Sequence, residues 1–395
     1  MLDYDCGNIC PVCASKDITN FIDFKNSHQF ITAYKPFKMQ KDICNNCGHI
    51  YVSSCHDYDI EGHYSTARGR GDLIYAQASQ IVQDEYHDLV NWLSDSIAMP
   101  DKVLDMGCGK CELLNAFKQK YSASDVFGID YSEDSIEYGK RFNIDTIFAG
   151  DLYTDSPHIS DFDVVAATNV LEHQYSLSKF LNRMKYLAND NASFLIQVPH
   201  SYSIIERKDL GSKYMHDLFN DEHVHHFNIE NLSNVLIANG FEVIKHRTNR
   251  RNDWDLIDIL FRVNNSNRNN GITFQDQGKT QQLIKYFNQK RAQDKSALNE
   301  LVGNNAAVGI YGGGWHTDVC LPSYYDFDFS DVKVIFDLDE RKQGKKLLGV
   351  EVVEPTSEVM NTLDLIIISS INLNDDIYKY LLNLGVSEHK IINLY

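Results

Sequence analysis

Short apolar runs alternate with amphipathic stretches through the middle of the chain. The stretch at 72–97 repeats its apolar residues at helical spacing, which predicts a helix. Apolar runs then begin at 102, 125, 145, 162 and 192, and most of them end in glycine or acidic residues. Strands that alternate with helices in this way indicate a parallel, doubly wound sheet of the α/β class.

The last third of the chain repeats this alternation after a polar, Asn-rich stretch at 262–278 that is typical of a linker. Its expected elements are a helix at 279–301, strands within 306–321, 332–353 and 363–371, and a helix at 377–386. Each strand pattern is again followed by a turn and a helical pattern. We therefore expect two Rossmann-like units in one chain.

The first 60 or so residues have a different pattern, with short expected strands and many Cys, Asn, Asp and aromatic residues. A chain of 395 residues has room for two or three domains. We expect a small N-terminal domain at 1–62, a first α/β domain at 63–265 and a second at 266–395.

Composition narrows the class of partner. The 37 basic and 55 acidic residues give a net charge of −18, which disfavours a nucleic-acid partner. No apolar run approaches the roughly 20 residues that span a bilayer, so no membrane partner is expected. The start, MLDYDCGNICPVC, lacks the features of a secretory signal. We expect a cytoplasmic protein with reduced cysteines; the sequence does not indicate an oligomeric state.

Two C-x2-C knuckles give the N-terminal segment its candidate chemistry. They supply Cys10 with Cys13, and Cys44 with Cys47. Two knuckles complete the tetrahedral four-sulfur site that structural zinc prefers, with no open position for catalysis. Such a small segment also needs a bound metal or a cross-link to be stable. The nearby alternatives as ligands are Cys6, His49 and Cys55.

The glycine turn after the apolar run at 102 is the candidate cofactor site. Gly107 and Gly109 lack the third glycine of a dinucleotide fingerprint, so the turn alone is a weak signal. Acidic residues at successive strand ends strengthen it: Asp105 before the turn, then Asp130, then Asp151. Ligands bind at this edge of open α/β sheets, and Asp130 lies where a carboxylate meets ribose hydroxyls.

This set, together with Asn169–His173, resembles the class I S-adenosylmethionine-dependent methyltransferases over about residues 70–240. The resemblance implies S-adenosylmethionine as the cofactor. The residues that it implies as contacts are Asp105, Gly107, Cys108, Gly109, Asp130, Tyr131, Asp151, Leu152 and Asn169.

The order of a four-cysteine module, a methyltransferase fold and a second Rossmann-like domain resembles the sugar C-methyltransferases over nearly the full length. The resemblance implies a nucleotide-linked keto-deoxysugar as substrate and proton removal next to its ketone, followed by attack of the enolate carbon on the methyl group. It implies Glu222 and His223 as the active-site pair. His173 and Tyr64 match positions assigned to the substrate pocket.

The chemistry that suits His223 is general base catalysis, because an unperturbed imidazole has a pKa of about 6.5. Glu222 is expected to orient the imidazole or to bind a sugar hydroxyl. For His225 and His226 we expect a structural role rather than a role in binding the substrate.

One departure from the family leaves the acceptor open. Asn220 stands where the family commonly has a Tyr, so a phenol that could hold the enolate oxygen is missing or is replaced by Tyr202, Tyr214 or His225. A sugar O-methyltransferase is therefore the alternative, and a binding protein without chemistry is a third hypothesis.

The second α/β domain has its own glycine turn, Gly312–Gly314, and Asp337 lies where a ribose-binding acid would stand. We expect this domain to share in binding the nucleotide-linked sugar. Packing that merely closes the substrate cleft is the alternative.

Overall fold

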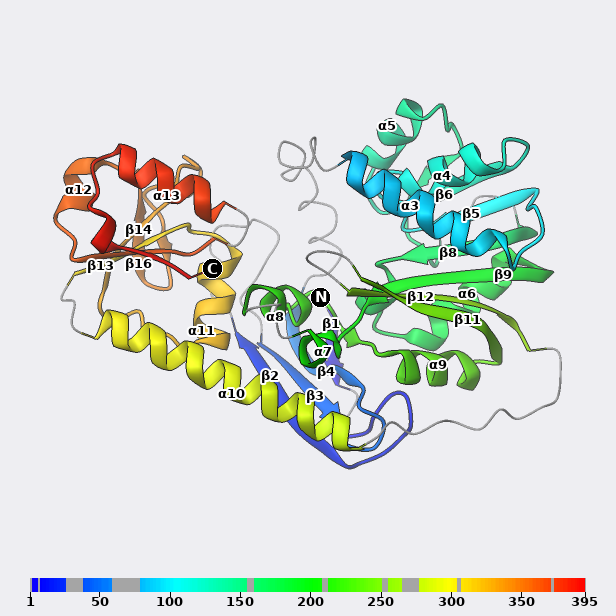
Figure 1. The fold of residues 1–395 in the computed structure, drawn as a ribbon, viewed down its shortest axis with the longest axis horizontal. Helices are drawn as coiled ribbons and strands as arrows, with labels where there is room; N and C mark the ends of the chain where they lie inside the picture. The colour runs from blue at the N-terminus through cyan, green and yellow to red at the C-terminus, as the bar shows by residue number, and fades with distance from the viewer. Residues whose placement is uncertain are drawn as a thin grey trace.

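The computed structural model describes residues 2–5, 8–25, 38–58, 79–154, 160–207, 212–250, 255–264, 277–303, 307–370 and 373–394. Tyr64, Cys6 and most of the expected linker lie outside these residues. Within them the strands form three sheets, which follow one another along the chain (Figure 1).

The N-terminal sheet is antiparallel and has the strand order β1-β4-β3-β2. Its strands are β1 (Leu2–Asp5), β2 (Ile18–Lys25), β3 (Lys38–Cys44) and β4 (Ile50–Tyr58). A short strand from much later in the chain, β10 (His225–His226), pairs with β4. The expected catalytic loop is therefore joined to the N-terminal sheet by backbone pairing.

The middle sheet has seven strands in the order β11-β12-β9-β8-β5-β6-β7. Its parallel strands are β5 (Lys102–Met106), β6 (Asp125–Asp130), β7 (Ile147–Ala149), β8 (Phe162–Thr168) and β9 (Ala188–Pro199). They confirm the expected doubly wound α/β fold. The sequence did not reveal the antiparallel hairpin of β11 (Phe241–Arg250) and β12 (Asp255–Val263), which extends the sheet beyond β9.

Helices cover both faces of the middle sheet. One apolar cluster joins α3 (Ser79–Ser94) and α4 (Glu112–Lys120) to the sheet, and another joins α6 (Leu177–Leu187) and α9 (Ile229–Ala238) to it. A further helix, α5 (Asp134–Arg141), follows β6. Because helices bury both faces, the central strands are apolar on both sides, as the sequence pattern showed.

The C-terminal sheet has the order β15-β16-β14-β13-β17-β18. Its strands are β13 (Val308–Tyr311), β14 (Val332–Phe336), β15 (Lys346–Leu347), β16 (Val350–Val353), β17 (Leu365–Ile368) and β18 (Ile391–Asn393). All pairings but β15 with β16 are parallel. The accompanying helices are α10 (Gln277–Val302), α11 (Leu321–Tyr324), α12 (Ser357–Asn361) and α13 (Asn374–Asn383).

A single apolar cluster ties the three segments together. The ring of Phe21 on β2 lies 4.9 Å from that of Phe219 and 4.2 Å from that of Phe287 on α10. Two short helices, α7 (Ser203–Glu206) and α8 (Ser212–Leu218), lead into this region from the middle sheet. In Figure 1 the blue N-terminal strands accordingly lie between the middle and C-terminal sheets.

None of the helices in the described ranges is both long enough and apolar enough to cross a membrane.

Candidate active site

The glycine turn after β5 has the shape of a ligand-binding loop. Gly107 has a φ of +82°, and a Cβ there would lie 2.4 Å from Val170 Cγ2, so only glycine fits. Asp130, at the end of β6, holds the turn: its Oδ2 accepts from Gly109 N at 2.9 Å and its Oδ1 from Ser132 N at 2.9 Å.

One cavity opens beside this turn, at the carboxyl ends of the parallel strands. It is lined by Gly107, Asp130, Tyr131, Leu152, Asn169, Val170, His173 and Gln174. Five of the expected cofactor contacts and His173 therefore lie together. Val170 belongs to the segment Asn169–His173 that carries the resemblance, and Gln174, which directly follows that segment, was not singled out from the sequence.

The other expected cofactor residues lie around the cavity without lining it. The Cys108 side chain is buried, and its sulfur lies where a side chain on Gly128 would have to go. Asp151 closes its own turn, with Oδ1 accepting from Tyr153 N at 2.6 Å. Asp105 is buried under the glycine turn, and its Oδ1 has no hydrogen-bond partner among the described residues.

Burial, with the charges of Asp130 and Glu112 nearby, raises the pKa of Asp105 to about 8. An orphaned buried carboxyl oxygen next to a concave glycine turn suits a ligand that brings positive charge. S-adenosylmethionine carries both a sulfonium and an amine, so these residues fit it.

His223 is held by the main chain. Its Nδ1 lies 2.9 Å from the carbonyl oxygen of Leu218, and because a carbonyl only accepts, Nδ1 carries the proton. Nε2 is then the basic nitrogen. Burial is the main cause that lowers the pKa of His223 to about 3, well below the ordinary value expected from the sequence. The imidazole is thus neutral, and Leu218 takes the orienting role that was expected of Glu222.

His173 stands between His223 and the cavity. Its ring centroid lies 5.0 Å from that of His223, and its Nδ1 donates to the carbonyl oxygen of Glu222 at 3.0 Å. Its Nε2 lies 3.7 Å from Glu172 Oε1. Glu222 therefore contributes to this site through its backbone.

Glu172 lies within the segment Asn169–His173, but nothing in the sequence assigned it a role of its own. It is 1% exposed, and neither carboxyl oxygen has a hydrogen-bond partner among the described residues. Burial raises the pKa of Glu172 to about 8, so the carboxyl is protonated at neutral pH. Glu172, His173 and His223 bring ligand atoms within 4.8 Å of one another. This set could move a proton or hold a divalent ion.

Asn220 and Lys41 fix the loop that carries His223. The Asn220 side chain accepts from Glu222 N at 3.0 Å and from His223 N at 2.9 Å, so Asn220 builds a turn. Lys41 is fully buried and donates to the carbonyl oxygens of Asn220 and His223. Nothing in the local sequence around Lys41 indicates this role.

The three residues considered as replacements for the missing phenol are engaged elsewhere. Tyr202 OH donates to the Gly48 carbonyl at 3.0 Å, Tyr214 OH contacts Ser203 Oγ, and His225 Nδ1 lies 3.0 Å from His49 Nε2. None of them lines the cavity. Among the side chains described around His223, the protonated Glu172 carboxyl is therefore a better hydrogen-bond donor than these three residues.

The comparisons with known proteins agree with this geometry. A family model described as a methyltransferase domain matches residues 78–246, the stretch that holds the glycine turn, the cavity and the His223 loop. This stretch of the chain is therefore a methyltransferase domain. A second model, described as C2185-like, N-terminal, matches residues 304–392. No curated protein sequence matches the chain.

Solved structures with a similar fold to the methyltransferase domain include magnesium protoporphyrin IX methyltransferase from Synechocystis PCC 6803. It is 17% identical, with a TM-score of 0.38, over 50% of this chain and 95% of that one. Another is 1,6-didemethyltoxoflavin-N1-methyltransferase from Burkholderia thailandensis. It is 16% identical, with a TM-score of 0.39, over 54% of this chain and 95% of that one. Such values are too low to indicate a substrate or to transfer residue roles.

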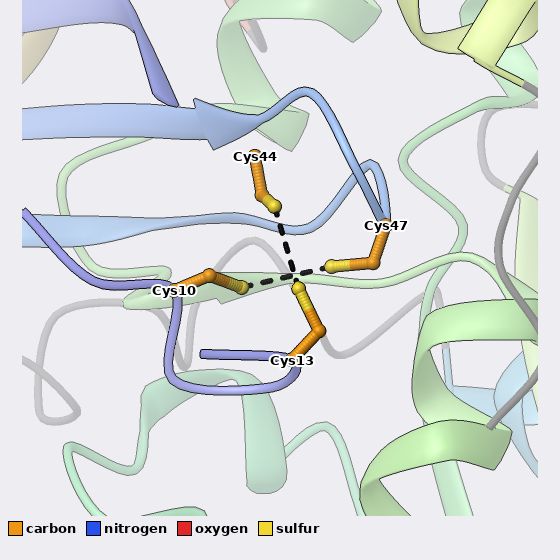
Figure 2. A group of neighbouring side chains, drawn as sticks. All are labelled: Cys10, Cys13, Cys44 and Cys47. Carbon is orange, nitrogen blue, oxygen red and sulfur yellow. Dashed lines mark hydrogen bonds between the residues drawn. The ribbon is translucent and has the colours of Figure 1, made fainter. Parts of the chain in front are cut away.

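The four expected zinc ligands converge next to the methyltransferase domain (Figure 2). Cys10 Sγ lies 3.6 Å from Cys47 Sγ, and Cys13 Sγ lies 3.6 Å from Cys44 Sγ. Four sulfurs about 2.3 Å from a tetrahedral ion would stand about 3.8 Å apart, so the set fits zinc. Hydrogen bonds within the set lower the pKa of Cys44 and raise the pKa of Cys10 and Cys47, so without an ion the negative charge is favoured on Cys44.

The C-terminal glycine turn repeats the arrangement of the methyltransferase domain. Asp337 Oδ2 accepts from Gly313 N at 2.8 Å and its Oδ1 from Asp339 N at 2.9 Å, as Asp130 does with its own turn. Lys342 Nζ also lies 2.8 Å from Asp337 Oδ2. Arg341 pairs with Asp339.

Proposed function

We propose that the chain transfers the methyl group of S-adenosylmethionine to a carbon of a nucleotide-linked keto-deoxysugar, with His223 as the general base. The observation that supports this most is the placement of His223. Its Nδ1–H is tied to Leu218, so its basic Nε2 belongs to a neutral ring beside His173, which lines the cofactor cavity. The order of the zinc-binding segment and two Rossmann-like units supports the sugar as substrate.

When bound, S-adenosylmethionine supplies an electrophilic methyl group on a sulfonium. His223 Nε2 takes the proton from the carbon next to the ketone, and the electrons of that C–H bond form the enolate. The enolate carbon would then take that methyl group as the bond between the methyl carbon and the sulfonium sulfur breaks. Burial favours the neutral, proton-accepting form of His223, and the negative enolate stabilises the imidazolium that forms.

In this proposal Glu172 takes the place of the missing phenol. A carboxyl that burial keeps protonated can donate a hydrogen bond to the enolate oxygen, where negative charge develops. Glu172 has no other hydrogen-bond partner among the described residues, and it lies beside both imidazoles. His173 between them fits a role in binding the sugar or in passing the proton to solvent.

The C-terminal domain is proposed to bind the nucleotide part of the substrate. Its glycine turn and Asp337 have the arrangement that Asp130 has with the glycine turn of the methyltransferase domain, where we expect the cofactor ribose to bind. Lys342, which now pairs with Asp337, could turn to a diphosphate.

One observation favours a second candidate, sugar O-methylation. Glu172, His173 and His223 are also the donor types of a two-His, one-carboxylate metal site, with ligand atoms within 4.8 Å. A divalent ion there would lower the pKa of a bound hydroxyl and favour oxygen as the acceptor. Methyl transfer that stops on chelation and ceases with any of the three ligands replaced would support this candidate.

Deuterium exchange separates the two candidates. The full chain is incubated in D2O with S-adenosylhomocysteine and a panel of nucleotide-linked keto- and hydroxy-sugars. We expect exchange of the proton next to the ketone with the wild type and with H246N, whose His lies on β11, and no exchange with H223N. With S-adenosylmethionine, NMR should show a new C–CH3 group.

An O–CH3 product without prior exchange would replace the first candidate with the second. Unchanged turnover of H223N would remove His223 as the base. Calorimetry of S-adenosylmethionine binding to H223N serves as the folding control, because His223 does not line the cofactor cavity. Absence of cofactor binding by the wild type would favour a protein without methyl transfer.

A further inference from the structure

A second group of metal-ligating side chains lies at the contact between the methyltransferase domain and the C-terminal domain. It consists of His216 on α8 and of His316 and Cys320 on the π-helical turn His316–Cys320. One ligand atom from each lies within 4.8 Å of the other two. All three side chains are buried, His216 and Cys320 to 1% exposure or less. They are far along the sequence from the four cysteines.

The local structure arranges two of the three ligands. His316 and Cys320 are four residues apart, so both project from one side of the turn. Single π-helical turns are rare and often occur at functional sites. The turn follows Gly312–Gly314 and begins directly after Trp315.

The His316 ring is also oriented by a second contact. Its Nδ1 lies 2.7 Å from Ser369 Oγ, and Thr317 Oγ1 donates to the same oxygen at 2.8 Å. Metal-ligating histidines almost always have their other ring nitrogen held in this way, which fixes the ring for the ion. A metal at Nε2 of His316 would thus find the ring already placed by Ser369.

We propose that His216, His316 and Cys320 bind a transition-metal ion, with zinc as the fitting ion, in a second site separate from the four-cysteine site. Two imidazoles and one thiolate are ligands that zinc accepts. On binding, the ion replaces the thiol proton of Cys320, and that proton goes to solvent.

Arg291, which lies near His216, points away from the cluster: it donates to the Ser323 carbonyl oxygen at 2.7 Å.

The place of the cluster suggests what the ion does. Around it the C-terminal domain contacts the loop that ends α8: Trp315 Nε1 donates to Asp221 Oδ1 at 2.6 Å, and Tyr324 OH donates to Phe219 O at 2.9 Å. An ion here would clamp α8 to the C-terminal domain. Since α8 ends at Leu218, which holds His223, the clamp would also steady the base; this last step rests on the proposed function.

Packing alone is the competing explanation. The His216 ring lies 4.4 Å from the ring of Tyr324 and 5.3 Å from that of Tyr325, so an aromatic cluster without metal could also fill this space. The two explanations predict different metal contents for the purified chain, and this difference can be measured without any substrate.

The test is the metal content of the full chain after gel filtration in chelator-free buffer, measured by mass spectrometry of the elements. We expect H216N, H316N and C320S each to hold about one equivalent less zinc than the wild type and than H246N. H223N reports separately on the Glu172–His173–His223 set. Equal metal content in all of these variants would overturn the proposal, and copper or iron in place of zinc would correct the ion.

A ligand variant that misfolds would also lose metal, so S369A is included as a further variant. It keeps all three ligands and removes the Ser369 hydroxyl, which contacts His316 Nδ1 and accepts from Thr317 Oγ1. We expect it to release the ion to a competing chelator roughly 10-fold more readily than the wild type. Cobalt substitution adds a spectroscopic readout: C320S should lose part of the thiolate-to-cobalt absorption, with the four-cysteine signal left. An unchanged spectrum in C320S would contradict the site.

Discussion

Lys41 Nζ lies 2.7 Å from the carbonyl oxygen of His223 and donates a hydrogen bond to it across 182 residues of sequence. The same ammonium lies 3.1 Å from His226 Nε2 and donates to the Asn220 carbonyl. Lys41 belongs to β3 of the N-terminal, four-cysteine segment, and β4 of that segment pairs with β10 just after His223. The N-terminal segment therefore builds one side of the candidate active site.

Replacing Lys41 by Met should lower the kcat of methyl transfer at least 10-fold and change S-adenosylmethionine affinity less than 2-fold. The change leaves buried carbonyl groups without a donor, at about 1–3 kcal/mol for each, and so loosens the loop that carries His223. Steady-state kinetics separates kcat from KM, and calorimetry measures cofactor affinity. K38M, an exposed Lys on the same strand, is the control. Equal kcat in K41M and K38M would show that Lys41 does not position the loop.

The parts of the fold that local pattern determines could be predicted from the sequence. An apolar run predicts the strand that ends at Met106, and the spacing of the glycines predicts the turn at Gly107. The contacts between segments could not be predicted: Lys41 reads as an ordinary polar residue of a short strand, and only the folded chain buries its ammonium. Likewise Glu172 carries no local sign that its carboxyl loses contact with water.

The hairpin of β11 and β12 was missed for a related reason. Lys245, His246 and Arg247 interrupt the apolar alternation of β11, because that strand lies at the edge of the sheet and is only half buried. Arg247 pairs with the buried Asp258 of β12 at 2.8 Å. Such an ion pair can be predicted only when the partner strand is already known.

Replacing Asn220 tests whether the turn matters more than the missing phenol. Asp keeps the acceptor for the Glu222 and His223 amides, whereas Ala and Tyr remove it. We expect N220D to retain most of the turnover, and N220A and N220Y to lose it about 10-fold. Methyl transfer under saturating substrate is the measurement. A gain of turnover in N220Y would mean that a phenol is needed at this position and that Glu172 does not replace it.

Asp130 should control cofactor affinity. Its two carboxylate oxygens hold the Gly109 and Ser132 amides, and it lines the cavity. Asn can supply only one accepting oxygen, so D130N should weaken S-adenosylmethionine binding at least 10-fold by calorimetry. D134N, an exposed acid at the start of α5, should bind as the wild type does. Equal affinities for D130N and D134N would place the cofactor elsewhere.

Glu172 should make stability fall as pH rises. Its pKa is about 8 in the folded chain, against an ordinary value of 4.5, so between these values the unfolded chain releases a proton that the folded chain keeps. The stability contribution is full below pH 4.5 and is lost as the pH rises through 8. E172Q has no such proton. Relative to the wild type, its stability should therefore increase from pH 5 to pH 8, on the order of 1–3 kcal/mol.

Urea midpoints at four pH values measure this difference, with E137Q, an exposed acid on α5, as the control. The same ionisation should limit catalysis, because an ionised Glu172 can no longer donate to the enolate oxygen. Turnover of the wild type should fall above pH 8, and E172Q, whose amide still donates, should be slower at its maximum but lack that alkaline fall. If the urea difference is constant with pH, Glu172 is ionised in the folded chain, and the donor of the proposed mechanism must be another group.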